Sequence, residues 1–126
     1  MPARSDVRPA REERLDLEPR IKLWVEKDGQ LVLSDYRVRL LRHIAETGSL
    51  AEAAERMGLS YRRAWGKVRE IEHNLGLSLV RSEVGGAGGG SSHLTEDGER
   101  LVALYQRFRR RMEGDLGREF DELFKG

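Results

Sequence analysis

The chain has 126 residues, 38% hydrophobic and 36% charged, which is enough for one domain with a modest core. The charges of its 23 basic and 22 acidic residues nearly cancel. This excludes a uniformly basic protein that coats nucleic acid, but it allows local basic patches. It has no cysteine, no apolar run as long as a membrane span and no signal-peptide core, so we exclude disulfides and thiolate sites and expect a cytoplasmic protein without a membrane partner.

The N-terminal third predicts an arm followed by a hairpin. Residues 1–20 are rich in arginine, acidic residues and proline, and they predict a flexible arm with a short helical piece near 12–17. Between Ile21 and Leu33, β-prone residues flank Asp28-Gly29, a dipeptide that strongly favours a hairpin turn. We therefore place the domain itself at 21–126.

Three predicted helices are each preceded by serine and followed by glycine. The first lies between Ser34 and Gly48, the second runs from Leu50 to Met57 before Gly58, and the third runs from Tyr61 to about Asn74 before Gly76. The middle helix opens with a capping box, in which Ser49 caps an amide and Glu52 reaches back. Its inward residues are predicted to be Ala51, Ala54 and Met57. The predicted apolar face of the third helix consists of Tyr61, Ala64, Trp65, Val68, Ile71 and Leu75.

A second hairpin and a long helix complete the predicted fold. A strand from Leu77 to Glu83, a glycine-rich loop and a short return at His93-Leu94 form the hairpin. Thr95 caps a last helix, predicted over about 95–124 and weakened or kinked by Gly114 and Gly117. One face of this helix carries Leu101, Leu104, Tyr105, Phe108 and Met112. That is more apolar surface than one helix can bury in so small a core, so a homodimer is expected.

The two short helices joined through Gly58-Leu59 predict a helix-turn-helix. The outer face of its second helix begins with Arg62 and Arg63, where the helix dipole disfavours cations but where a recognition helix reaches base edges. The same face carries Gly66, Lys67 and Glu70. The glycine destabilises the helix by about 1 kcal/mol relative to alanine, and close approach of the helix to DNA would explain its presence. The alternative is a solvated face on which this glycine is neutral.

The glycine-rich residues 85–90 lie between two predicted strands and lack the pattern of a nucleotide-binding loop. At the tip of a hairpin they predict the wing of a winged helix, whose amides approach phosphates; a flexible linker is the alternative. The predicted contacts to double-stranded DNA are Ser49, Ser60, Tyr61, Arg62, Arg63, Gly66, Lys67, Gly86, Gly88, Gly89, Gly90, Ser91 and Ser92. The three histidines show no metal-ligand spacing and no catalytic constellation is evident, so we expect no enzyme, metal or cofactor.

Four segments resemble the DNA-binding domain of the molybdate-responsive ModE regulators. They are Gly48–Ala54, Gly58–Trp65, Val84–Gly90 and Leu94–Gly98. The first and last are shared with LysR-type regulators, whereas the Ser-Tyr-x-x-Ala-Trp and Gly-Gly-x-Gly-Gly-Gly pieces are more ModE-like. The resemblance covers about Leu33 to Phe108. It implies a winged helix, a dimer formed through the N- and C-terminal elements, and bacterial transcription regulation.

The expected fold is mainly α with small β-hairpins: a winged helix-turn-helix with an N-terminal β-hairpin and a C-terminal dimerisation helix. The expected function is that of a sequence-specific DNA-binding transcriptional regulator of the ModE type that lacks the molybdate-binding domain. ModE proteins usually continue into that domain near where this chain ends, so oxyanion sensing is not carried over. Either the protein binds DNA without a ligand, or another chain supplies the sensor. The alternative function is a protein-interaction module without direct DNA readout.

Overall fold

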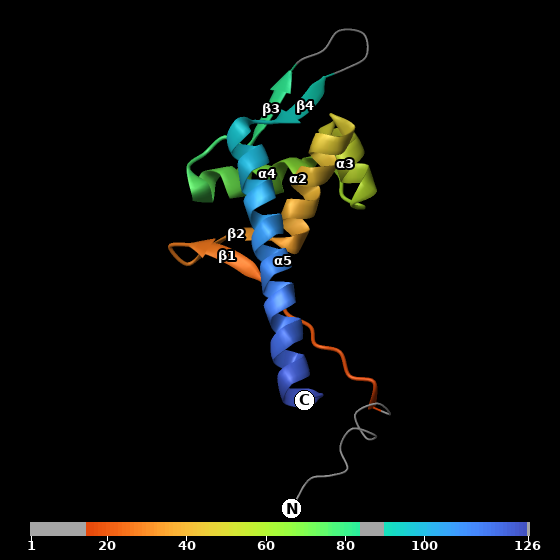
Figure 1. Cartoon of the computed structure of the whole chain (residues 1–126). Helices are drawn as coiled ribbons and strands as arrows, with labels where there is room; N and C mark the ends of the chain where they lie inside the picture. The colour runs from red at the N-terminus through yellow and green to blue at the C-terminus, as the bar shows by residue number, and fades with distance from the viewer. Residues whose placement is uncertain (1–14, 84–89, 126) are drawn as a thin grey trace, which may run out of the picture. The chain divides into compact units, whose positions relative to one another are not determined.

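The computed structural model describes residues 15–83 and 90–125 of the chain. Its elements are β1 (Trp24–Lys27), β2 (Gln30–Ser34), α2 (Asp35–Thr47), α3 (Leu50–Arg56), α4 (Tyr61–Leu75), β3 (Val80–Glu83), β4 (Ser91–Leu94) and α5 (Glu96–Phe124). They divide into a unit from Leu23 to Arg107 and a second unit formed by the two ends of the chain. This order of elements confirms the predicted fold class of helices with small hairpins (Figure 1).

The first hairpin confirms the Asp28-Gly29 prediction. β1 and β2 pair antiparallel, with Lys27 opposite Gln30, so that only these two residues form the loop. Both have positive φ, 52° for Asp28 and 78° for Gly29, as the favoured two-residue hairpin turn requires. The first strand begins at Trp24 and not at Ile21. The predicted helical piece near 12–17 lies mostly outside the described residues.

The predicted helix boundaries hold because local capping sets them. Ser34, Ser49 and Ser60 each accept a hydrogen bond from the third amide of the following helix. Gly48 and Gly76 adopt the left-handed conformation that ends α2 and α4. The second half of the predicted capping box is wrong, because the Ser49 amide donates to Thr47 Oγ1 at 3.1 Å and not to Glu52.

The core of the Leu23–Arg107 unit joins the helices to both hairpins. Its largest fully buried side chains are Leu40, Leu41, Ile44, Leu50, Ile71, Leu79, Val32 and Val68. From α3 it takes Ala53 and Ala54, whereas Ala51 is exposed, so the prediction that Ala51 packs inward is wrong. In Figure 1, β1 and β2 lie at the start of α2, whereas β3 and β4 lie at its other end, beside α3.

The second hairpin and α5 meet at a close backbone approach. Thr95 caps α5 by accepting from the Gly98 amide at 3.0 Å, as predicted. A Cβ atom on Gly98 would lie 2.4 Å from the Leu79 carbonyl oxygen, so only glycine fits there. α5 is one continuous helix through Gly114 and Gly117, so these glycines do not interrupt it, and their weakening of the helix stays a prediction.

The second unit is small in its described part. Residues 19–21 and the C-terminal half of α5 line a pocket of about 250 Å³, with Leu116 and Gly117 in its wall. Further along α5, Phe120 and Phe124 stack with ring centroids 4.4 Å apart. None of the helices within 15–83 and 90–125 is long and apolar enough to cross a lipid bilayer.

Candidate nucleic-acid interface

A tight turn brings α3 and α4 together. Gly58 has a φ of 69°, and the Leu59 amide donates to the Ala54 carbonyl at 2.9 Å, which closes the turn directly after α3. Ala53 and Ala64 are fully buried, and their small side chains let the two helices approach closely. The outer face of α4 is thereby left free of the rest of the fold, as in a helix-turn-helix.

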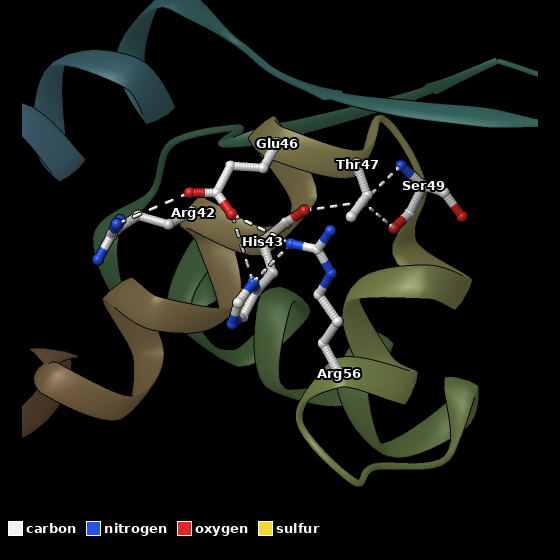
Figure 2. A network of polar contacts seen from close by, with 6 residues as sticks. All are labelled: Arg42, His43, Glu46, Thr47, Ser49 and Arg56. Carbon is white, nitrogen blue, oxygen red and sulfur yellow. Dashed lines mark hydrogen bonds and ion pairs between the residues drawn. The ribbon is translucent and has the colours of Figure 1, made fainter.

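A polar network fixes α3 against α2 (Figure 2). Glu46 Oε1 on α2 lies 3.2 Å from Arg56 Nη1 on α3, and 3.6 Å from the ring of His43. The Thr47 hydroxyl, 2.7 Å from the His43 carbonyl oxygen, accepts the Ser49 amide. These contacts hold the start of α3, and with it Ser49, in one position relative to α2.

The outer face of α4 presents two arginines and a bare backbone. Ala64, Val68 and Ile71 are buried on the inner side, whereas Arg62, Arg63 and Gly66 are exposed. Within the described residues the side chains of Arg62 and Arg63 make no ion pair or hydrogen bond, so all their donors are available. Nothing lies within 4 Å of a Cβ built on Gly66, so the fold itself does not require glycine there.

On each flank of α4 a basic side chain lies over an aromatic ring, an arrangement that the sequence did not indicate. Lys67 is half-buried and lies over the ring of Tyr36 on α2, with Nζ 5.3 Å from the ring centroid. On the other flank, the exposed Arg69 lies over Trp65 at 5.2 Å. Sequence reasoning missed Arg69 as a candidate DNA contact. Its position seven residues after Arg62, on the same side of the helix, was the available signal.

A cleft of about 330 Å³ separates the start of α3 and α4 from the second hairpin. It is lined by Ser49, Leu50, Ala51, Tyr61, Ser82, Glu83, Gly90, Ser91 and Ser92. Tyr61 was expected on the apolar face of α4 and also among the DNA contacts; its side chain is 55% exposed and borders this cleft. Glu83, which sequence reasoning did not single out, brings a carboxylate into the cleft and accepts from the Ser91 hydroxyl at 3.4 Å.

The predicted contacts therefore fall into groups. Ser49, Tyr61, Gly90, Ser91 and Ser92 meet in the cleft, while Arg62, Arg63 and Gly66 lie on the outer face of α4. Ser92 is 6% exposed, and its hydroxyl lies 3.3 Å from that of Ser82. It therefore forms part of the wall of the cleft and does not offer a free hydrogen-bond donor. Ser60 is occupied in capping α4. Gly86, Gly88 and Gly89 lie outside the described residues.

Comparison with known proteins identifies this arrangement. Residues 36–99 match the family described as bacterial regulatory helix-turn-helix protein, LysR family. The chain is similar to the DNA-binding transcriptional dual regulator ModE of Escherichia coli, with 36% identity over 71% of this chain and 34% of that protein. It is also similar to the molybdenum-pterin-binding protein MopB of Rhodobacter capsulatus, with 44% identity over 55% of this chain and 26% of that protein. The chain thus spans about a third of the length of these relatives or less.

Solved structures show the same fold. The DNA-binding domain of CbnR in complex with DNA superposes with a TM-score of 0.52 at 22% identity, covering 71% of this chain and 93% of that one. DarR of Vibrio fischeri, also in complex with DNA, superposes with a TM-score of 0.54 at 16% identity over 75% of this chain and 30% of that one. At these identities the similarity is one of fold.

Proposed function

Since this chain belongs to the LysR family of bacterial regulatory helix-turn-helix proteins, we propose that it regulates transcription by reading a specific sequence of double-stranded DNA as a homodimer. The observation that carries the proposal is the outer face of α4, where Arg62 and Arg63 are exposed without partners among the described residues beside the backbone of Gly66. Such a function is one of binding and not of catalysis, and in a bacterium it is exercised in the cytoplasm.

In the proposed complex α4 lies in the major groove with its N-terminal turn against the base edges. The groove is about 12 Å wide and admits one helix, so Arg62 and Arg63 come within reach of guanine O6 and N7. Each good bidentate pair contributes roughly 1–3 kcal/mol of discrimination against a wrong base. Because Gly66 has no side chain, the helix axis approaches the bases closely at this turn.

The cleft beside the second hairpin fits the sugar-phosphate backbone of one strand. Its lining includes the Gly90 backbone, the Ser91 hydroxyl, which can rotate from Glu83 toward a phosphate, and Tyr61. Backbone amides and hydroxyls are common donors to phosphate oxygens, and these contacts fix the register of a protein on the duplex. In this proposal the hairpin acts as the wing, and it contributes affinity without reading sequence.

Dimerisation is proposed because α5 leaves large apolar side chains exposed. Leu104 is 49% exposed and Phe108, one turn later, 43% exposed, while Val102 and Tyr105 are buried against the core. A second copy covering these side chains would remove them from water, at about 25 cal/mol per Å² of apolar surface. A two-fold dimer also presents two α4 helices to two half-sites, which one copy cannot do.

Selection of bound fragments from random duplex DNA, followed by binding titrations on the enriched site at several salt concentrations, tests the proposal. We expect one enriched, two-fold symmetric motif and a steep loss of affinity with salt. Arg62→Ala/Arg63→Ala should lose the preference for that motif, while Arg107→Ala, a substitution that removes a charge at an exposed site on α5, should keep it. Absence of any enriched motif, or binding that does not depend on salt, would contradict DNA readout and favour a protein-interaction module.

The dimer is tested separately by analytical sedimentation of the chain. Sedimentation as a monomer at micromolar concentration would contradict the dimer.

A further inference from the structure

Two cations are gathered over one exposed aromatic ring on the flank of α4. Tyr36, in the first turn of α2, is 37% exposed. Lys67 Nζ lies 5.3 Å from the centroid of its ring and Arg39 Cζ lies 5.8 Å from it. The negative face of an aromatic ring attracts cations, so Tyr36 holds both side chains near one place.

The acidic groups nearby are engaged elsewhere. Glu70 pairs with the buried Arg37 at 3.2 Å, and Asp35 accepts from the Tyr105 hydroxyl at 2.5 Å. Within residues 15–83 and 90–125 neither Arg39 nor Lys67 makes an ion pair or a hydrogen bond. Two positive charges on one ring repel each other, and the ring offsets this only in part. The cluster of Tyr36, Arg39 and Lys67 therefore provides a surface that an anion would stabilise.

The position of the cluster indicates which anion. Successive residues along α4 turn by about 100°. Measured from Gly66 on the outer face, Lys67 therefore lies about 100° to one side, whereas Tyr61 and the cleft lie about 140° to the other. A helix of about 10–12 Å diameter in a groove about 12 Å wide has a phosphate backbone on each flank. If the cleft receives one strand, the flank that carries Lys67 faces the other strand. A DNA phosphate fits this geometry better than a free acidic ligand, because α4 itself would bring it there.

We propose that Tyr36, Arg39 and Lys67 form a phosphate-binding site for the DNA strand across the groove from the second hairpin. Arg39 and Lys67 contact the phosphate, and Tyr36 is a positioning residue that holds them. The inference rests on the proposed DNA binding and deepens it. With this site, phosphate contacts hold α4 on both flanks and set its depth and angle in the groove. The two arginines at its N-terminus then read sequence from a fixed position.

The test compares the full chain with variants on a selected duplex and on a scrambled one, each titrated over a range of salt. Arg39→Ala/Lys67→Ala should weaken binding to both duplexes alike, by about tenfold or more, and reduce the salt slope by about 0.9 for each phosphate that the variant no longer neutralises. Tyr36→Leu, which keeps apolar cover, should weaken binding in the same sequence-independent way. Tyr36→Phe keeps the ring and should bind like the unmodified chain. Thermal melts check that each variant is folded.

A methylphosphonate scan locates the contact. Neutralising phosphates one at a time on each strand should reveal a position that weakens binding of the unmodified chain and has no further effect on Arg39→Ala/Lys67→Ala. That position should lie on the strand opposite the one sensitive to changes at Gly90 and Ser91. If the chain binds DNA with a preference that depends on Arg62 and Arg63, while the cluster variants keep affinity, salt slope and methylphosphonate pattern, the phosphate site is wrong and the proposed function stands. If neither the unmodified chain nor any variant binds duplex DNA, both are wrong.

Discussion

Replacing Gly66 by alanine should move stability and DNA affinity in opposite directions. Gly66 lies in the middle of α4, exposed, with no atom within 4 Å of the added Cβ, and its φ is not in the left-handed region. Nothing in the fold opposes a methyl group there. Alanine is favoured over glycine in a helix interior by about 0.8–1.0 kcal/mol, so Gly66→Ala should stabilise the free protein by about that amount.

The same methyl group should obstruct the approach to DNA. Cβ extends about 1.5 Å from the helix backbone, toward the groove and between the turns that carry Arg62 and Arg69. If α4 lies as close to the bases as proposed, the helix has to withdraw and the arginine contacts lengthen. We expect the binding free energy on the selected duplex to fall by about 1.4 kcal/mol or more, which is a tenfold larger dissociation constant.

Thermal unfolding and duplex titration measure the two effects on one sample. For a chain of 126 residues, about 1 kcal/mol raises the melting temperature by roughly 4 °C. Gly114→Ala is the matched control, because this glycine is exposed in α5 and its Cβ would meet only the Arg118 guanidinium at 3.8 Å. That variant should gain stability and bind DNA unchanged. Should Gly66→Ala gain stability and bind DNA with unaltered affinity, the glycine is neutral and the close approach of α4 is refuted.

Three further substitutions test the interface and the fold. Arg63→Ala should relax sequence preference at one position of each half-site, by about 1–3 kcal/mol in a randomised library, and an unaltered preference would show that Arg63 reads no base. Glu83→Gln should raise DNA affinity about two- to threefold at low salt, since a carboxylate in the cleft repels phosphate by roughly 0.5–0.7 kcal/mol at 6–8 Å in water, and the gain should vanish at high salt. Weaker binding would instead make Glu83 a DNA contact. Gly98→Ala should destabilise the fold by about 1–3 kcal/mol in urea unfolding, because its Cβ would meet the Leu79 carbonyl at 2.4 Å, and an unchanged midpoint would contradict that packing.

Local chemistry let the sequence by itself determine where most elements begin and end. Asp28-Gly29 specifies a two-residue hairpin turn, and Ser60 caps α4 by a bond to an amide three residues away. Gly58 closes the turn between α3 and α4 through its left-handed conformation. Each of these signals involves residues that are neighbours along the chain. These signals set the ends of the two helices of the helix-turn-helix and place Arg62 and Arg63 at the start of the second helix without reference to tertiary packing.

The tertiary structure decided what each flank of those helices meets. Helical spacing placed Tyr61 and Trp65 on one apolar stripe, but the second hairpin stands off from the start of α4 and leaves Tyr61 exposed at the cleft. The same spacing left Lys67 among the outer residues, and only the packing of α2 beside α4 brings it over Tyr36, 31 positions earlier in the sequence. A period of 3.6 residues gives directions around one helix axis. Which neighbour fills each direction depends on how the helices cross, and contacts between distant residues fix that crossing.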